Sequence, residues 1–201
     1  MLDRAVTALI KPLVTGLARG LQRAGVSANQ LTLTGFSIGM LAAFLIANSD
    51  YLAGAAALFI SRLCDALDGA VARLTRPTDA GAFLDIALDF LFYASIPLAF
   101  AVADPARNAL PAAVLLAAFM GTGTSFLAFA VLAAQRGLSS TDYPDKSFYF
   151  LGGLTEATET LLFFAAMCLW PELFIELAYT FAALCAITTA TRLWWGWRTF
   201  S

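Results

Sequence analysis

The sequence lacks histidine, has only three cysteines and contains few charged residues. Charged side chains make up 13% of the 201 residues, against about 25% in a typical soluble domain. Hydrophobic residues make up 60%, so we expect an integral membrane protein with one domain. Cys64, Cys168 and Cys185 match no zinc pattern, and without histidine a thiol nucleophile has no usual activating base. The sequence has no basic tail and no basic–aromatic interleaving, which argues against a nucleic-acid partner.

Six apolar segments are long enough to cross a hydrocarbon core of about 30 Å. They cover residues 30–48, 51–74, 81–103, 109–134, 149–169 and 173–196. Residues 1–25 combine apolar residues at three- and four-residue spacing with basic residues, and predict an amphipathic helix in the membrane interface that ends at Gly25. The expected fold is all-α and integral to the membrane. A single domain would cover residues 1–201, with the interfacial helix followed by a six-helix bundle over 30–196.

Basic residues fall unequally on the two sides of this topology. With the N-terminus inside, the cytoplasmic side holds Arg4, Lys11, Arg19, Arg23, Arg73, Arg76, Arg136, Lys146, Arg192 and Arg198. The opposite side holds only Arg107, and Arg62 lies within a span. This asymmetry follows the positive-inside rule and predicts a cytoplasmic N-terminus. The polar segment 136–147 then reads as a cytoplasmic loop.

Four aspartates lie at the adjoining ends of the second and third predicted spans. They are Asp65, Asp68, Asp85 and Asp89, and their spacing of three and four puts each pair on one helix face. A short turn containing Pro77 would bring the two faces together. An ionised carboxylate within a membrane helix costs about 2.5–3.5 kcal/mol on insertion scales, so four of them indicate bound cations. Carboxylates without histidine favour Mg²⁺, Mn²⁺ or Ca²⁺, and two ions about 3.5–4 Å apart form the usual clamp for displacement at phosphorus.

Glycine and arginine accompany the aspartates at fixed spacing. The pattern consists of Asp65, Asp68, Gly69, Ala72, Arg73, then seven residues, then Gly81, Asp85 and Asp89. It resembles the signature of the CDP-alcohol phosphotransferase family, Asp-x-x-Asp-Gly-x-x-Ala-Arg followed by Gly-x-x-x-Asp-x-x-x-Asp, whose gap is about eight residues. Segment 26–32 also resembles the family's Pro-Asn-x-x-Thr before the first span, with Ala28 replacing proline.

The resemblance implies transfer of a substituted phosphate from a CDP-linked donor to an alcohol, with release of CMP. It implies that Asp65, Asp68 and Asp85 bind one Mg²⁺ and that Asp65, Asp85 and Asp89 surround a second. Asp89 is then also the expected acceptor of the alcohol's proton. The implied nucleotide-binding residues are Gly69, Ala72, Arg73, Gly81, Asn29 and Thr32. For Asn29 an alternative is a helix cap.

The resemblance also implies CDP-diacylglycerol as donor, membrane lipid as surroundings, a homodimer and a bacterial inner membrane, and the distribution of basic residues predicts that the active site is on the cytoplasmic side. Glycerol 3-phosphate is the first-choice acceptor; phosphatidylglycerol, inositol phosphate and serine are the others. Family members that use diacylglycerol as the acceptor rely on a histidine, which this chain lacks, so the resemblance argues against a choline or ethanolamine phosphotransferase of that kind.

The acceptor candidates are Lys146, Glu156, Glu159 and Arg192. As alternatives, the two cations anchor the chain at the interface, and the two glutamates form ion pairs with Lys146, Arg136 or Arg62.

Two other functions fit an aspartate cluster in a membrane. One is a divalent-cation transporter with a midplane carboxylate site, and the other is a helical bundle without catalysis. The shallow position of the aspartates and the glycine–arginine pattern favour the enzyme. Gly35 and Gly39 have the spacing that lets helices approach closely, either within one chain or between two.

Overall fold

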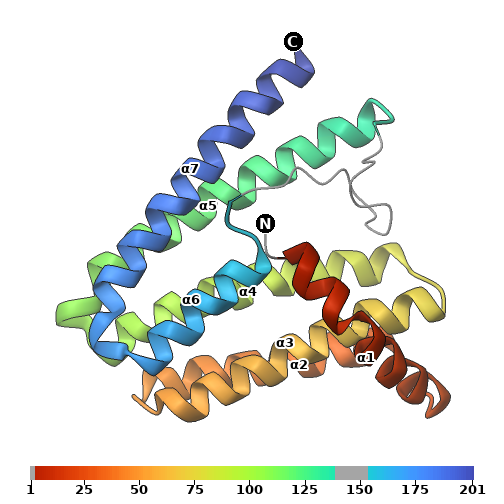
Figure 1. Cartoon of the computed structure of the whole chain (residues 1–201), viewed down its shortest axis with the longest axis horizontal. Coiled ribbons are helices and arrows are strands. Elements are labelled where there is room, and N and C mark those ends of the chain that lie inside the picture. The colour runs from red at the N-terminus through yellow and green to blue at the C-terminus, as the bar shows by residue number, and fades with distance from the viewer. Residues whose placement is uncertain (1–2, 139–153) are drawn as a thin grey trace.

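The computed structural model describes residues 3–138 and 154–201, with side chains from residue 6 onward (Figure 1). Its elements are α1 (Asp3–Arg23), α2 (Ala28–Ala47), α3 (Tyr51–Leu74), α4 (Asp79–Ala103), α5 (Pro105–Gln135), α6 (Ala157–Leu169), the 3-10 turn η1 (Pro171–Leu173) and α7 (Phe174–Phe200). These residues form helices and no strands, which confirms the all-α class.

Four helical segments in the described part of the chain are long and apolar enough to cross a membrane. They are α2, α4, α5 and the continuous stretch of η1 and α7. The remaining two predicted spans correspond to α3, which carries Arg62, Asp65 and Asp68, and to α6, which has 13 residues. The count of six spans therefore stays a prediction.

Two helix starts differ from the sequence prediction by four residues or more. The first concerns α6, because residues 154–156 are not helical and the helix begins at Ala157 rather than at 149; residues 149–153 lie outside the described part. At this start the backbone N–H of Glu156 donates to Oε2 of Glu159 at 3.2 Å, which caps the helix. The second is α5, which begins at Pro105, four residues before the predicted start at residue 109.

The connection between α1 and α2 confirms Gly25 as a helix end and corrects the position of the next cap. Gly25 has φ of 80°, and the N–H of Val26 donates to the carbonyl of Leu21 at 3.0 Å, as in a Schellman motif. The cap of α2 is Ser27, whose Oγ accepts from the N–H of Gln30 at 3.2 Å. The proposed cap role of Asn29 is wrong, because Asn29 lies inside the first turn of α2.

Most of the bundle shares one apolar core. Its largest fully buried side chains include Phe92 and Phe100 of α4, Phe164 of α6, and Phe174 and Phe181 of α7. Figure 1 shows α5 and α7 as a pair that extends away from the layer of α2 and α3.

A smaller apolar cluster holds α1 against the bundle. It consists of Val14, Ala18, Leu31, Leu67, Ala70 and Val71. On α1, Leu9 and Leu13 are exposed, at 80% and 66%, although both are apolar. The helix thus buries one apolar strip against α2 and α3 and leaves other apolar side chains uncovered.

α2 packs closely against both α3 and α4, whereas α3 and α4 approach each other far less. The close packing depends on glycine: a Cβ at Gly35 would lie 2.9 Å from Cβ of Cys64, and one at Gly39 would lie 2.6 Å from Cδ2 of Phe92. The two glycines therefore pack within one chain, which decides the alternative left open by their spacing. α3 and α4 both pack on α2, and polar side chains that include Arg62, Asp65 and Asp89 lie in the space between α3 and α4.

Candidate active site

Three of the four aspartates meet in the space between α3 and α4. Asp65, Asp68 and Asp85 each offer a carboxylate oxygen, and these oxygens lie within 4.8 Å of one another. Arg62 and Asp89, which lie farther from the connecting residues 75–78, are also in contact, so the two helices run antiparallel. The prediction that the two aspartate-bearing faces come together is confirmed for these residues.

The carboxylate of Asp68 fits a cation-binding role. Asp68 is 4% exposed, and its Oδ2 has no hydrogen-bond partner among the described residues. The hydroxyl of Thr32 lies within hydrogen-bonding reach of the Asp68 carboxylate and also of the carbonyl of Ala28, to which it donates at 3.0 Å. An unsatisfied buried acceptor costs about 1–3 kcal/mol, and more when charged. Since the donor set is all oxygen, a Mg²⁺ or Mn²⁺ ion suits these three carboxylates.

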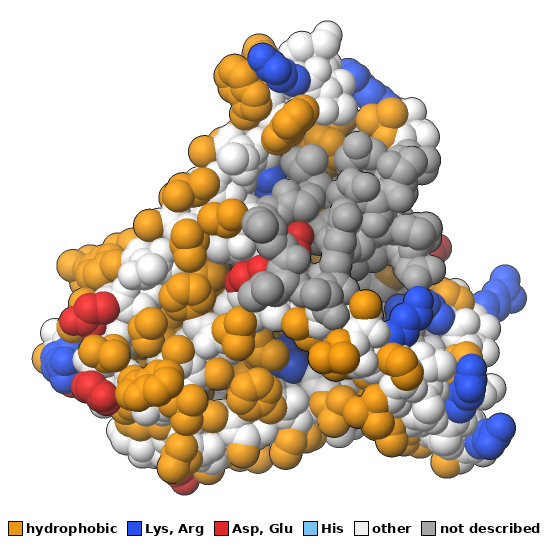
Figure 2. All heavy atoms as spheres, in the orientation of Figure 1, with side chains coloured by type: hydrophobic (Ala, Val, Ile, Leu, Met, Phe, Trp, Pro, Cys, Tyr) orange, Lys and Arg blue, Asp and Glu red, His pale blue; other side chains and the backbone are white. Residues whose placement is uncertain are grey.

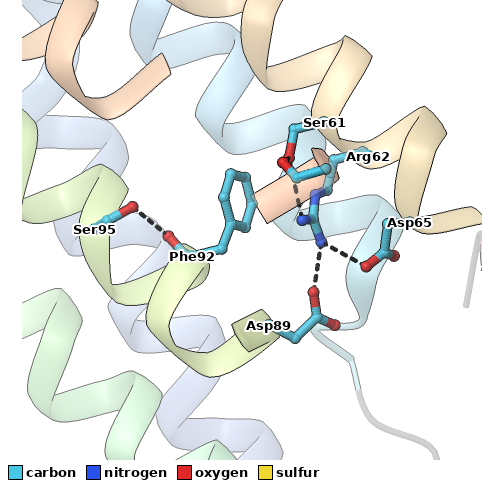
Figure 3. Close-up of polar contacts among 7 residues, drawn as sticks. Ser61, Arg62, Asp65, Asp89, Phe92 and Ser95 are labelled. Carbon is cyan, nitrogen blue, oxygen red and sulfur yellow. Dashed lines mark hydrogen bonds and ion pairs between the residues drawn. The ribbon is translucent and has the colours of Figure 1, made fainter. Parts of the chain in front are cut away.

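Asp89 lies outside this group of three carboxylates and accepts a hydrogen bond from Arg62 (Figure 3). Nη1 of Arg62 donates to Oδ1 of Asp89 at 2.6 Å and lies 3.3 Å from Oδ1 of Asp65. The guanidinium therefore bridges α3 and α4 beside the three-carboxylate group. A small cavity here is lined by Thr32, Gly35, Phe36, Arg62, Asp65, Asp85, Leu88 and Asp89.

Arg62 is the functional residue that the sequence reading missed. Its position three residues before Asp65 places it on the same face of α3, and this spacing was the available signal. The sequence reading had considered Arg62 only as a partner for the glutamates. In the structure it neutralises part of the aspartate cluster instead.

Gly69, Ala72, Arg73 and Gly81 lie at the adjoining ends of α3 and α4, and Asn29 and Thr32 lie near the start of α2. Among the described residues a Cβ on Gly69 would meet only Nη1 of Arg73, at 3.4 Å, so no rigid neighbour among them requires glycine there. A Cβ on Gly81 would lie 3.0 Å from Oδ1 of Asn29, which brings the start of α2 next to the start of α4.

Exposure separates these residues further. Asn29 and Arg73 are exposed, Ala72 and Gly81 are half-buried, and Thr32 is buried in the cavity lining. The nucleotide-binding role of the set stays a prediction.

The candidate acceptor residues form a separate polar group near the start of α6. Arg192 is buried and donates from Nη1 to the carbonyl of Thr122 at 3.0 Å, while its Nε has no hydrogen-bond partner among the described residues. Glu156 interacts electrostatically with Arg192. Thr155 donates to Oγ1 of Thr188 from both its N–H and its hydroxyl, at 3.1 and 3.0 Å. Lys146 lies outside the described residues.

Two of the ion pairs considered for the glutamates are not formed. Arg62 binds Asp65 and Asp89, and Arg136 donates to the carbonyls of Thr199 and Phe200 at the end of α7. The observed role of Glu159 is to accept the backbone N–H of Glu156.

Figure 2 shows how polar and apolar side chains divide this face of the molecule. Hydrophobic side chains cover much of it, acidic side chains appear near its centre and at its left edge, and most basic side chains lie at the top and at the lower right. This distribution suits a lipid-embedded bundle with a polar centre.

Comparison with known proteins assigns the chain to a class. A family model of CDP-alcohol phosphatidyltransferases matches residues 26–196. The chain belongs to the CDP-alcohol phosphatidyltransferase family and is an enzyme of that class, which confirms the resemblance. The cation-transporter alternative has no support from this match.

The similar proteins include a bacterial membrane protein and archaeal synthases. The chain is 52% identical to the inner membrane protein YnjF of Escherichia coli K12 over 199 residues, which cover 99% of this chain and 97% of that protein. It is 46% identical over 70 residues to archaetidylinositol phosphate synthase of Methanothermobacter thermautotrophicus, 34% of this chain and 36% of that one.

Solved structures share the fold. Phosphatidylinositol phosphate synthase PgsA1 of Mycobacterium tuberculosis with CDP-DAG bound gives a TM-score of 0.73 at 23% identity, over 92% of this chain and 94% of that one. The same synthase with manganese and citrate gives 0.69 at 24% identity, over 92% and 88%.

Proposed function

We propose that this enzyme transfers the phosphatidyl group of CDP-diacylglycerol to the hydroxyl of an alcohol and releases CMP, in phospholipid synthesis. The observation that carries this proposal is the meeting of Asp65, Asp68 and Asp85, with a buried Asp68 oxygen that lacks a partner among the described residues. Membership of the family supports a CDP-linked donor. The CDP-DAG in the related fold supports diacylglycerol as the lipid part.

Asp65, Asp68 and Asp85 would hold Mg²⁺, with Mn²⁺ as a substitute. When bound, the ion neutralises the diphosphate and stabilises the departing phosphate of CMP. Arg73, exposed beside Gly69, would pair with diphosphate oxygens through its planar fork. Asn29 and Gly81, with Ala72 and Thr32 behind them, would line the nucleotide side of the site.

Asp89 would accept the proton of the acceptor hydroxyl. The hydroxyl oxygen forms a bond to the phosphorus of the phosphatidyl group as the bond from that phosphorus to the CMP oxygen breaks, and the proton passes to the carboxylate of Asp89. Because Arg62 binds Oδ1 of Asp89, we assign the proton to Oδ2. The guanidinium then fixes the orientation of the base relative to the substrate.

The acceptor that we favour is a phosphorylated polyol. Glycerol 3-phosphate and inositol phosphate are the first two acceptors to test. Inositol phosphate is included because the archaeal relatives are archaetidylinositol phosphate synthases and the solved structure with the same fold is a phosphatidylinositol phosphate synthase. Its phosphate would approach Arg192, which has an Nε donor to spare, and Lys146. Phosphatidylglycerol and serine follow.

The same proposal includes the membrane arrangement. Six spans would be made by α2, α3, α4, α5, the segment ending in α6, and α7, in one domain. The uncovered apolar side chains Leu9 and Leu13 of α1 would enter the cytoplasmic interface. By family resemblance the enzyme would form homodimers in a bacterial inner membrane.

The test is CMP release by the purified protein from CDP-diacylglycerol, with a panel of acceptors and Mg²⁺ or a chelator. We expect release with at least one polyol phosphate, and a loss of about 10³-fold in Asp85→Asn, since a charge-stabilising group of the site is removed. Asp79→Asn is the matched control, because Asp79 lies in the exposed first turn of α4. Full activity of folded Asp85→Asn would overturn the proposal.

A further inference from the structure

The guanidinium of Arg62 lies between Asp65 and Asp89, where the family resemblance implies a second metal ion. Nη1 of Arg62 lies 2.6 Å from Oδ1 of Asp89 and 3.3 Å from Oδ1 of Asp65. Both aspartates belong to the set implied for the second ion. The cation beside them is thus already supplied by the chain itself.

Arg62 is held in this position from several sides (Figure 3). Its Nη2 donates to Oγ of Ser61 at 3.3 Å, and that hydroxyl donates to the buried carbonyl of Gly35 at 2.7 Å. Its guanidinium carbon lies 3.8 Å from the centre of the Phe92 ring, a cation–π contact. The side chain is 11% exposed. Arg62 is therefore a fixed part of the site and differs from a surface arginine that moves freely.

The same contacts divide the four aspartates into two groups. Asp65, Asp68 and Asp85 bring oxygens within 4.8 Å of one another, and Asp89 is not part of that group. A Mg²⁺ ion needs oxygen ligands at about 2.0–2.1 Å in near-octahedral geometry. Oδ1 of Asp89 is turned instead toward the guanidinium.

We propose that the substrate-free enzyme holds one divalent ion, at Asp65, Asp68 and Asp85, and that the guanidinium of Arg62 takes the place of a second ion beside Asp89. A second ion would have to share Asp65 and Asp89 with a fixed positive charge, which repels it. Arg62 is thus a positioning residue that sets the metal count and the orientation of Asp89. The inference rests on the proposed function only for the presence of a divalent ion.

The experiment counts Mn²⁺ ions bound to the purified, substrate-free protein, by titration and by electron paramagnetic resonance. We expect about one ion per chain and the spectrum of an isolated Mn²⁺ in the unmodified protein. In Arg62→Gln we expect about two ions and the spin coupling of a pair about 3.5–4 Å apart. Arg136→Gln is the matched control and keeps one ion, because Arg136 contacts only the end of α7 among the described residues.

A second pair of variants leaves Arg62 in place and decides the matter if Arg62→Gln does not fold. Asp89→Asn keeps the ion count and affinity of the unmodified protein, while Asp68→Asn weakens Mn²⁺ binding by about 100-fold as a ligand is lost. Two ions in the unmodified protein, with one lost in Asp89→Asn, would overturn the inference. Ion counts as expected without CMP release from any donor would instead remove the proposed function and leave the inference standing.

Discussion

Two regions of the molecule bury acidic side chains, and they handle the charge differently. Between α3 and α4, the guanidinium of Arg62 pairs with Asp65 and Asp89, while Asp68 and Asp85 lie beside Asp65 and one Asp68 oxygen has no hydrogen-bond partner among the described residues. At the start of α6, the side chain of Glu159 accepts a backbone N–H. The first region has an excess of negative charge, whereas the second uses its acid as a helix cap.

The difference teaches that buried acids do not identify a ligand site by their number alone. A carboxylate that accepts hydrogen bonds from the fold contributes to stability. A carboxylate whose neighbours are other carboxylates needs a cation from outside, and Asp68 is in that position. Variants in the aspartate region should therefore respond to divalent ions, whereas variants at the start of α6 should not.

The largest expected effect is that of Asp68→Asn. We expect CMP release to fall by about 10³-fold, because a metal-binding oxygen is lost. In a chelator, its thermal unfolding temperature should equal or exceed that of the unmodified protein, since a buried charge is removed. Differential scanning fluorimetry with and without Mn²⁺ measures this, and a lower unfolding temperature in chelator would contradict it.

Arg62→Gln should give the opposite response to metal removal. Breaking a buried ion pair by removing one partner costs about 3 kcal/mol, at the low end of the usual range because the aspartates are partly exposed. We expect the unfolding temperature in chelator to fall and Mn²⁺ to restore most of it. A deficit that Mn²⁺ leaves unchanged would show that packing on Phe92, rather than charge, explains the loss.

A matched pair of glycines compares the packing beside the aspartate region with the packing between α5 and α7. In Gly39→Ala the new Cβ would lie 2.6 Å from Phe92 and 2.9 Å from Oγ of Ser61, so we expect a loss of about 2 kcal/mol and weaker metal binding. In Gly121→Ala the new Cβ would lie 3.0 Å from Oγ1 of Thr189, and alanine favours the helix. We expect that variant to be nearly neutral. Equal losses in chemical denaturation would contradict the comparison.

The smallest effect should come from the cap of α6. Glu159→Ala removes the acceptor for the N–H of Glu156 and should cost about 1 kcal/mol, while Glu159→Gln keeps an acceptor oxygen and should be close to neutral. Neither change should alter Mn²⁺ affinity. If Glu159→Gln instead raised the KM for the acceptor with stability unchanged, Glu159 would bind substrate.

The aspartate cluster was predictable because helical spacing alone places Asp65 and Asp68 on one face, and a short turn brings Asp85 toward them. The position of Arg62 was not predictable from the sequence, because an isolated arginine in a span has several plausible partners. Asp89 becomes its partner because α2 packs against both α3 and α4 and so brings the two helices together.

The polar cap of α6 was missed for a different reason. Glu156 and Glu159 were read as costly buried charges in a span, although a spacing of three is also that of a capping box. Where acidic residues lie three apart next to threonine, a helix start should be considered before a substrate site.

Thr78 caps the start of α4, because its Oγ1 accepts the N–H of Gly81 at 3.1 Å. The position of this helix start therefore does not depend on the length of the connection that precedes Thr78. Since this cap and the aspartates of α4 belong to one helix, a residue added or removed between Leu74 and Thr78 would lengthen or shorten the connection without rotating Asp85 or Asp89. A gap of seven residues here, against about eight in the family pattern, is thus compatible with one carboxylate geometry. This connection is where relatives can differ in length while keeping the same chemistry.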